Sequence, residues 1–317
     1  ILMITALLNP ALIIFVCGIL LGSIFKSITP PTFISKYLGY YLLLGLGLKG
    51  GYSLQQTGFI NDVINVLSLG VFFALLVPIT SYLYLKRILN ADDAAALSGT
   101  YGSVSAVTFV TANTYLLASS QNYENYMSAV LVVMEFPAIF MALYLVTQNG
   151  SQQSKSKIQT LKTAFLEIPN IVLLSSLIFA YNFKFNNLEL LNLFTKNIFD
   201  IVLIVFLFIM GLSVSKRMSE LSGKGSQLIS FALITPVTGS LIALIFSSYF
   251  GLSVGNATLL MVLTASASYI AVPAVVKDAI PNANPAIYLG LSLGVTFPFN
   301  VIIGIPLYNQ LAIYFLN

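Results

Sequence analysis

Apolar runs separated by short polar or Gly/Pro-containing segments extend along the whole chain. A helix of about 17 to 25 apolar residues crosses the hydrocarbon core of a bilayer, and these runs have that length. Breaking the chain at its polar and Gly/Pro positions predicts ten spans, at 9–25, 37–54, 64–85, 94–117, 126–147, 167–182, 199–215, 226–250, 257–276 and 286–315. The polar stretch 148–162 (QNGSQQSKSKIQTLK) cannot bury apolar area and is predicted to be a linker.

The composition strengthens this interpretation. Of the 317 residues, 58% are hydrophobic and 8% are charged, whereas soluble domains carry roughly 25% charged residues. With no histidine and one cysteine, the chain cannot form zinc sites of the usual type, internal disulfides or Cys/His nucleophile pairs. The basic residues lie singly between apolar spans, so the net charge of +4 does not indicate nucleic-acid binding. We therefore predict an all-α integral membrane protein.

The basic residues also predict an orientation. Most of them follow the odd-numbered spans, and cytoplasmic loops are enriched in Lys and Arg. This bias places the central linker in the cytoplasm and both termini outside. The residues on the cytoplasmic side would be Lys26, Lys36, Lys86, Arg87, Lys155, Lys157, Lys162, Lys216, Arg217, Lys224 and Lys277, and those on the other side Lys184, Lys196 and Lys49.

Five landmarks recur in the same order in both halves of the chain, each pair separated by about 160 residues. Because each half has an odd number of spans, the two halves would lie in opposite orientations, as in many secondary transporters. The sequence thus predicts a first five-helix repeat at 1–147, a cytoplasmic linker at 148–165 and a second, inverted repeat at 166–317. The pairs are Pro10 and Pro169, Gly47 and Gly211, Pro78 and Pro236, Ser105 and Ser268, and Pro137 and Pro298.

The fourth and ninth spans are predicted to be broken helices that cross near mid-membrane. The fourth has Gly99 and Gly102 at its centre among several hydroxyl side chains, and the ninth has Thr264, Ser266 and Ser268 before Pro273. Irregular backbone at this depth is tolerated where it lines a cavity or is buried in protein. Exposed N–H groups at half-helix N-termini, together with hydroxyls, suit a small oxyanion. Close helix packing by small residues is the alternative explanation.

Glu135 in the fifth span is the strongest intramembrane candidate, because an ionisable residue at mid-bilayer is expensive and usually functional. The matching part of the tenth span offers Thr296 and Asn300 around Pro298. Carboxylate, amide and hydroxyl oxygens suit Na⁺, so these three residues are predicted to hold a coupling cation. A protonated Glu135 bonded between helices is the alternative. Glu135 has no identifiable acid, base or nucleophile partner, so no enzyme activity is expected.

At these segments the sequence resembles the sodium-dependent bicarbonate permease family, of the SbtA type. The similar stretches are YGSVSAVTF (101–109), YENYMSAVLVVMEFPAI (123–139), SASYIAVPA (266–274) and IPNANPAIYLGLSLGVTFPFNVIIGIPLY (280–308). The resemblance runs collinearly over nearly the whole chain. It implies Na⁺-coupled uptake of bicarbonate by alternating access, a core with crossed broken helices beside a gate domain, and a homotrimer in the bacterial cytoplasmic (inner) membrane.

The resemblance also implies a substrate site at the two breaks. Its expected residues are Gly102, Ser103, Val104, Ser105, Ala106, Thr108, Ser266, Ala267, Ser268 and Tyr269. Tyr269 stands where the family pattern has Asp, whereas Glu135 retains a carboxylate. In the family, a PII-like partner protein regulates transport through the cytoplasmic face. The linker of this chain is short, whereas the family's is long and acidic, so the same regulation is an open question here. A small organic anion such as a monocarboxylate, and a passive anion channel or sensor, are the alternative functions.

Overall fold

The computed structural model describes residues 10–25, 32–147, 166, 168–183, 192–220, 225–269, 272, 276 and 280–316. Within these ranges every regular element is a helix, which confirms the all-α prediction. The predicted linker, 148–165, and Pro273 lie outside the described residues.

The helices begin and end close to the predicted span boundaries. In chain order they are α2 (Pro10–Ile24), α3 (Thr32–Thr57), α4 (Asn61–Leu85), α5 (Ala91–Gly102), α6 (Ala106–Ala118), α7 (Met127–Thr147), α9 (Ile168–Asn182), η1 (Leu193–Asn197), α11 (Ile198–Glu220), α12 (Ser226–Tyr249), α13 (Val254–Ala265), α15 (Pro285–Leu291), η2 (Ser292–Thr296), α16 (Phe297–Phe299), η3 (Asn300–Gly304) and α17 (Ile305–Leu316). The three η segments are π-helical, and two of them interrupt the last predicted span.

Four helical stretches in the described part of the chain are long and apolar enough to cross a bilayer. They are Asn61–Leu85, Phe194–Lys216, Ser226–Tyr249 and Pro285–Leu316. The chain is therefore a membrane protein.

The fourth predicted span is divided into two helices, as expected. Helix α5 ends at Gly102, residues 103–105 are non-helical, and α6 begins at Ala106. In the ninth span, α13 ends at Ala265 and residues 266–269 are non-helical. Both interruptions therefore fall among the serines that the sequence indicated.

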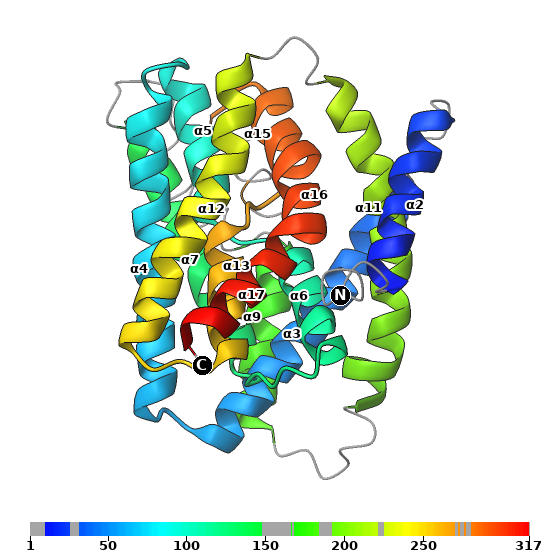
Figure 1. Cartoon of the computed structure of the whole chain (residues 1–317), viewed down its shortest axis with the longest axis vertical. Coiled ribbons are helices and arrows are strands. Elements are labelled where there is room, and N and C mark those ends of the chain that lie inside the picture. The colour runs from blue at the N-terminus through cyan, green and yellow to red at the C-terminus, as the bar shows by residue number, and fades with distance from the viewer. Residues whose placement is uncertain are drawn as a thin grey trace.

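The helices pack in two groups (Figure 1). In the first, α2 lies along α11, and α3 lies along α9 and also contacts α11. In the second, α4 packs on α5 and α7, while α13 packs on α12 and α17. Glycines allow the close contacts of the first group: a Cβ added to Gly211 would lie 2.3 Å from the carbonyl oxygen of Phe15, and one on Gly51 would lie 2.1 Å from that of Leu177.

Candidate functional site

The break between α5 and α6 is held by packing and by a helix cap. Gly102 lies against the ring of Pro78 in α4, where an added Cβ would be 2.5 Å from the proline Cγ. Ser105 is the N-cap of α6, and its hydroxyl accepts hydrogen bonds from the backbone N–H of Thr108 at 3.2 Å and from the Thr108 hydroxyl at 2.9 Å. Gly102 and Thr108 thus shape the break.

The second break begins where α13 ends. Its last residue, Ala265, has a carbonyl oxygen that no intrahelical N–H can reach, and the Asn300 amide donates a hydrogen bond to it at 2.8 Å. The next residue, Ser266, donates from its hydroxyl to the Leu263 carbonyl at 2.9 Å. The helix end is thereby satisfied although the backbone departs from helical geometry.

The two breaks are hydrogen-bonded to each other. The backbone N–H of Ser105 donates to the Ser266 hydroxyl at 2.9 Å, and the backbone N–H of Ser268 donates to the Thr100 carbonyl at 2.9 Å. All four residues are buried, so these bonds form away from water. Segments more than 160 residues apart in the chain therefore form one local structure.

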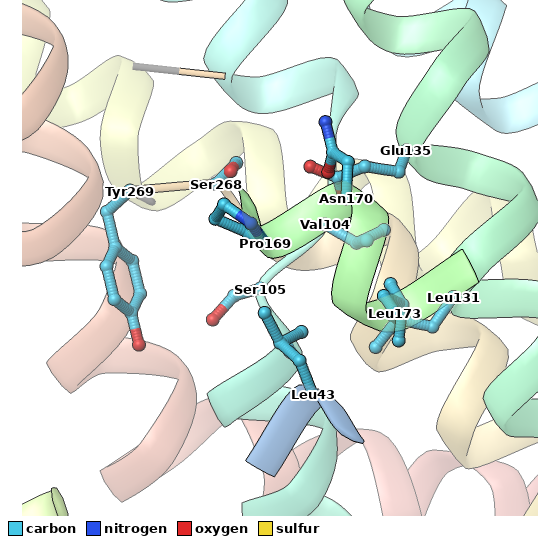
Figure 2. A pocket seen from close by; sticks show the side chains of 11 residues that line it. Leu43, Val104, Ser105, Leu131, Glu135, Pro169, Asn170, Leu173, Ser268 and Tyr269 are labelled. Atoms are coloured by element: carbon cyan, nitrogen blue, oxygen red, sulfur yellow. The ribbon is translucent and has the colours of Figure 1, made fainter. Parts of the chain in front are cut away.

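A small cavity of about 30 Å³ lies beside the joined breaks. A water molecule needs about 10–15 Å³ of such volume, so the cavity has room for the equivalent of two or three waters. Figure 2 shows the hydroxyls of Ser105 and Tyr269 at one end and the side chains of Glu135 and Asn170 at the other. Its lining residues are Leu43, Val104, Ser105, Ala106, Leu131, Glu135, Pro169, Asn170, Leu173, Ser268 and Tyr269.

Three buried polar groups at this site lack hydrogen-bond partners in the described part of the chain: Glu135 Oε1, the Ser103 hydroxyl and the Tyr269 hydroxyl. The side chains are 4%, 1% and 9% exposed, respectively. The Ser103 hydroxyl faces the Glu135 carboxyl group and the Tyr269 hydroxyl faces Ser105, without reaching hydrogen-bonding geometry. Because buried polar groups are nearly always paired, these three mark a place for a polar ligand.

The groups around the cavity include donors that suit an anion and oxygen acceptors that suit a cation. The first turn of α6 presents the N–H groups of Ala106 and Val107, which have no intrahelical acceptor and favour an anion. Glu135 supplies carboxylate oxygens of the kind that bind hard cations. No group of three or more His, Cys, Asp or Glu side chains lies together among the described residues. Carboxylate oxygens such as those of Glu135 suit Na⁺ among the hard cations.

The structure gathers part of the predicted site around this cavity. Val104, Ser105, Ala106, Glu135, Ser268 and Tyr269 line it, whereas Gly102, Ser103, Thr108, Ser266, Ala267, Thr296 and Asn300 do not.

Thr296 and Asn300 use their side chains in bonds between helices. Thr296 donates at 2.8 Å to the carbonyl of Ala232, which Pro236 deprives of its helical partner, and it accepts from the Tyr101 hydroxyl at 2.5 Å. Asn300, which bonds Ala265, accepts from the Tyr308 hydroxyl at 2.9 Å. Neither residue lines the cavity with Glu135.

Sequence reasoning missed five lining residues, which come from three helices. Leu43 belongs to α3, Leu131 to α7, and Pro169, Asn170 and Leu173 to α9. Asn170 is 2% exposed at the start of α9. The available signal was an amide side chain inside an apolar span directly after a proline, but only the proline was used, as a landmark of the repeat.

A comparison with family models agrees with the resemblance noted in the sequence. The model of the Na⁺-dependent bicarbonate transporter superfamily matches residues 10–313. No curated protein matches the chain closely enough to be counted as a relative. The superfamily is one of transporters, not of enzymes. The match extends over nearly the entire sequence, and the chain therefore belongs to the Na⁺-dependent bicarbonate transporter superfamily.

Proposed function

We propose that the chain is a secondary active transporter that couples the uptake of bicarbonate to Na⁺ by alternating access. The observation that carries this proposal is the pair of hydrogen-bonded helix breaks beside a small cavity with unpaired buried polar groups. Helix breaks of this kind form substrate and ion sites in secondary transporters. Membership of the superfamily supports the choice of ions.

The cavity supports a small cargo. Bicarbonate has four non-hydrogen atoms, slightly more than the two or three waters that a cavity of about 30 Å³ accommodates, so a larger anion fits still less well. In the proposed mode the anion lies at the end near Ser105 and Tyr269, where hydroxyls and the first turn of α6 offer donors without a fixed countercharge. The other residues predicted for the substrate site do not line the cavity, and we propose that they support it by shaping the two helix breaks. They are Gly102, Ser103, Thr108, Ser266 and Ala267.

The architecture that we propose with this function has ten spans in two inverted repeats, 1–147 and 166–317, joined by a cytoplasmic linker at 148–165. Both termini lie outside, and a homotrimer sits in the bilayer of the bacterial cytoplasmic membrane. A PII-like regulatory protein is a candidate partner for the cytoplasmic face. Single cysteines introduced into the linker of a Cys17→Ser protein, and labelled from either side of right-side-out vesicles, test the orientation. Light scattering of the purified protein tests the trimer.

Transport measurements test the function directly. Purified protein in liposomes is expected to accumulate labelled bicarbonate under an inward Na⁺ gradient and to show saturable rates. A K⁺ gradient of equal size serves as the control. Absence of Na⁺-driven uptake would overturn the proposal.

The two alternatives give different results in the same liposomes. If a monocarboxylate were the cargo, acetate or formate would be accumulated and bicarbonate would not compete with it. A passive channel or sensor would show non-saturating flux, or none, with no dependence on Na⁺.

A further inference from the structure

Glu135 and Asn170 line the same cavity from two different groups of helices. Glu135 belongs to α7, which packs mainly on α4 and α5, whereas Asn170 is in the first turn of α9, which packs along α3. The side chains are 4% and 2% exposed. Figure 2 shows both side chains on the side of the site away from the Tyr269 hydroxyl. The cavity therefore lies on the boundary between the two groups.

The chemistry of this end suits a cation. Glu135 Oε1 has no hydrogen-bond partner in the described part of the chain, and neither has the Ser103 hydroxyl that faces it. Among the residues that the structure describes, no Lys or Arg lines the cavity to neutralise the carboxylate. A buried carboxylate without a countercharge is costly, and oxygen ligands from carboxylate, amide and hydroxyl groups bind hard cations.

We propose that Na⁺ binds in the cavity between Glu135 and Asn170. This inference rests on the proposed Na⁺-coupled function and names a ligand set different from Glu135, Thr296 and Asn300. Asn170 lines the cavity together with Glu135, whereas Thr296 and Asn300 do not.

The placement gives the ion a part in coupling. A Na⁺ held by one residue from each helix group bridges the boundary between α7 and α9. If the groups move relative to each other, Na⁺ loses the Asn170 oxygen and is bound more weakly. An ion that has different affinities for two conformations shifts the equilibrium between them.

Na⁺ binding can be measured without transport, through the thermal unfolding midpoint of the purified full chain. NaCl replaces choline chloride at constant ionic strength, and the wild type is expected to gain stability saturably. Asn170→Leu is expected to raise the half-saturating Na⁺ concentration about tenfold, because it removes one oxygen ligand. Leucine has a similar volume to asparagine, so the packing changes little. Asn182→Leu is the matched control, because Asn182 is exposed at the other end of α9 and bonds only the Ile178 carbonyl of its own helix in the described structure.

Two further variants decide the outcome. Asn170→Asp keeps an oxygen ligand and adds charge, so it is expected to bind Na⁺ at least as tightly as the wild type. Thr296→Val is expected to lower the midpoint without Na⁺ but to leave the half-saturating concentration unchanged. A wild-type Na⁺ response in Asn170→Leu, loss of the response in Asn170→Asp, or a shift in Thr296→Val alone would overturn the inference.

The outcome is separable from that of the proposed function. Liposomes that fail to take up bicarbonate, together with an Asn170-dependent Na⁺ response, would reject the cargo and keep the ion site. Na⁺-driven uptake that is indifferent to Asn170→Leu would reject the ion site and keep the function.

Discussion

Gly102 packs against the ring of Pro78 so closely that no larger residue fits between α5 and α4. Gly102→Ala would place a Cβ 2.5 Å from the proline Cγ, and the rigid ring cannot move aside. We expect a loss of about 1–3 kcal/mol in the free energy of unfolding, the usual cost of overpacking. The measurement is the unfolding midpoint of the protein in detergent.

Gly39→Ala is the matched control for this substitution. Its Cβ would lie 3.5 Å from the Phe206 ring, an ordinary contact, and alanine favours the helix by about 0.5–1 kcal/mol. Gly39→Ala is thus expected to be neutral or stabilising. Equal midpoints for the two variants would contradict the proposed role of Gly102.

Ser266→Ala is expected to destabilise the joined breaks. It removes the acceptor of the Ser105 N–H, which stays buried, and an unsatisfied buried donor costs about 1–3 kcal/mol. Ser247→Ala makes the same chemical change at another buried serine, whose hydroxyl has no hydrogen-bond partner in the described residues. Thermal unfolding should separate the two variants, and a Ser266→Ala protein as stable as Ser247→Ala would argue against the cross-link.

Ser105 tests the substrate site, provided that its capping role is separated from its place in the cavity. Ser105→Leu fills the cavity and is expected to abolish bicarbonate uptake in liposomes. Ser105→Ala removes the cap of α6, at about 1 kcal/mol, but leaves the space open. Both variants lack the capping hydroxyl, so we expect Ser105→Ala to lose about as much stability as Ser105→Leu. Unlike Ser105→Leu, it should retain measurable bicarbonate uptake. Retained transport by Ser105→Leu would refute the site.

Glu135→Gln is expected to raise the Na⁺ concentration needed for half-maximal bicarbonate uptake by about tenfold or more, because a charged ligand becomes neutral. Glu124→Gln is the control, since Glu124 is exposed in the segment between α6 and α7. The rates are measured over a range of Na⁺ at constant ionic strength. An unchanged Na⁺ dependence would favour the alternative, in which a protonated Glu135 is hydrogen-bonded between helices.

The helices and the position of the breaks could be predicted from the sequence because both depend on local pattern. Apolar length sets the spans, and the serines at 103–105 and 266–268 mark where helical structure ends. Other contacts lack such a pattern: Asn90 is the N-cap of α5, and Asp93 in its first turn accepts a hydrogen bond from the backbone N–H of Asn284 at 2.6 Å. That bond spans 191 residues and leaves no local signature.

The predicted cation ligands show the same limit. Thr296 and Asn300 have the right oxygens, but tertiary contacts decide whether those oxygens are free. The Thr296 oxygen accepts from the Tyr101 hydroxyl, 195 residues away, and the Asn300 oxygen accepts from the Tyr308 hydroxyl. Asn170 was overlooked because its role depends on α9 packing beside α7, which no periodicity reveals.

One cross-link between the breaks joins main-chain atoms alone, from the Ser268 N–H to the Thr100 carbonyl. No change of either side chain removes that bond, apart from proline at 268. Saturation mutagenesis would consequently score Thr100 and Ser268 only by their side chains and would underrate this contact. Replacing the amide that precedes Ser268 by an ester through semisynthesis would expose it, since only the N–H would be lost.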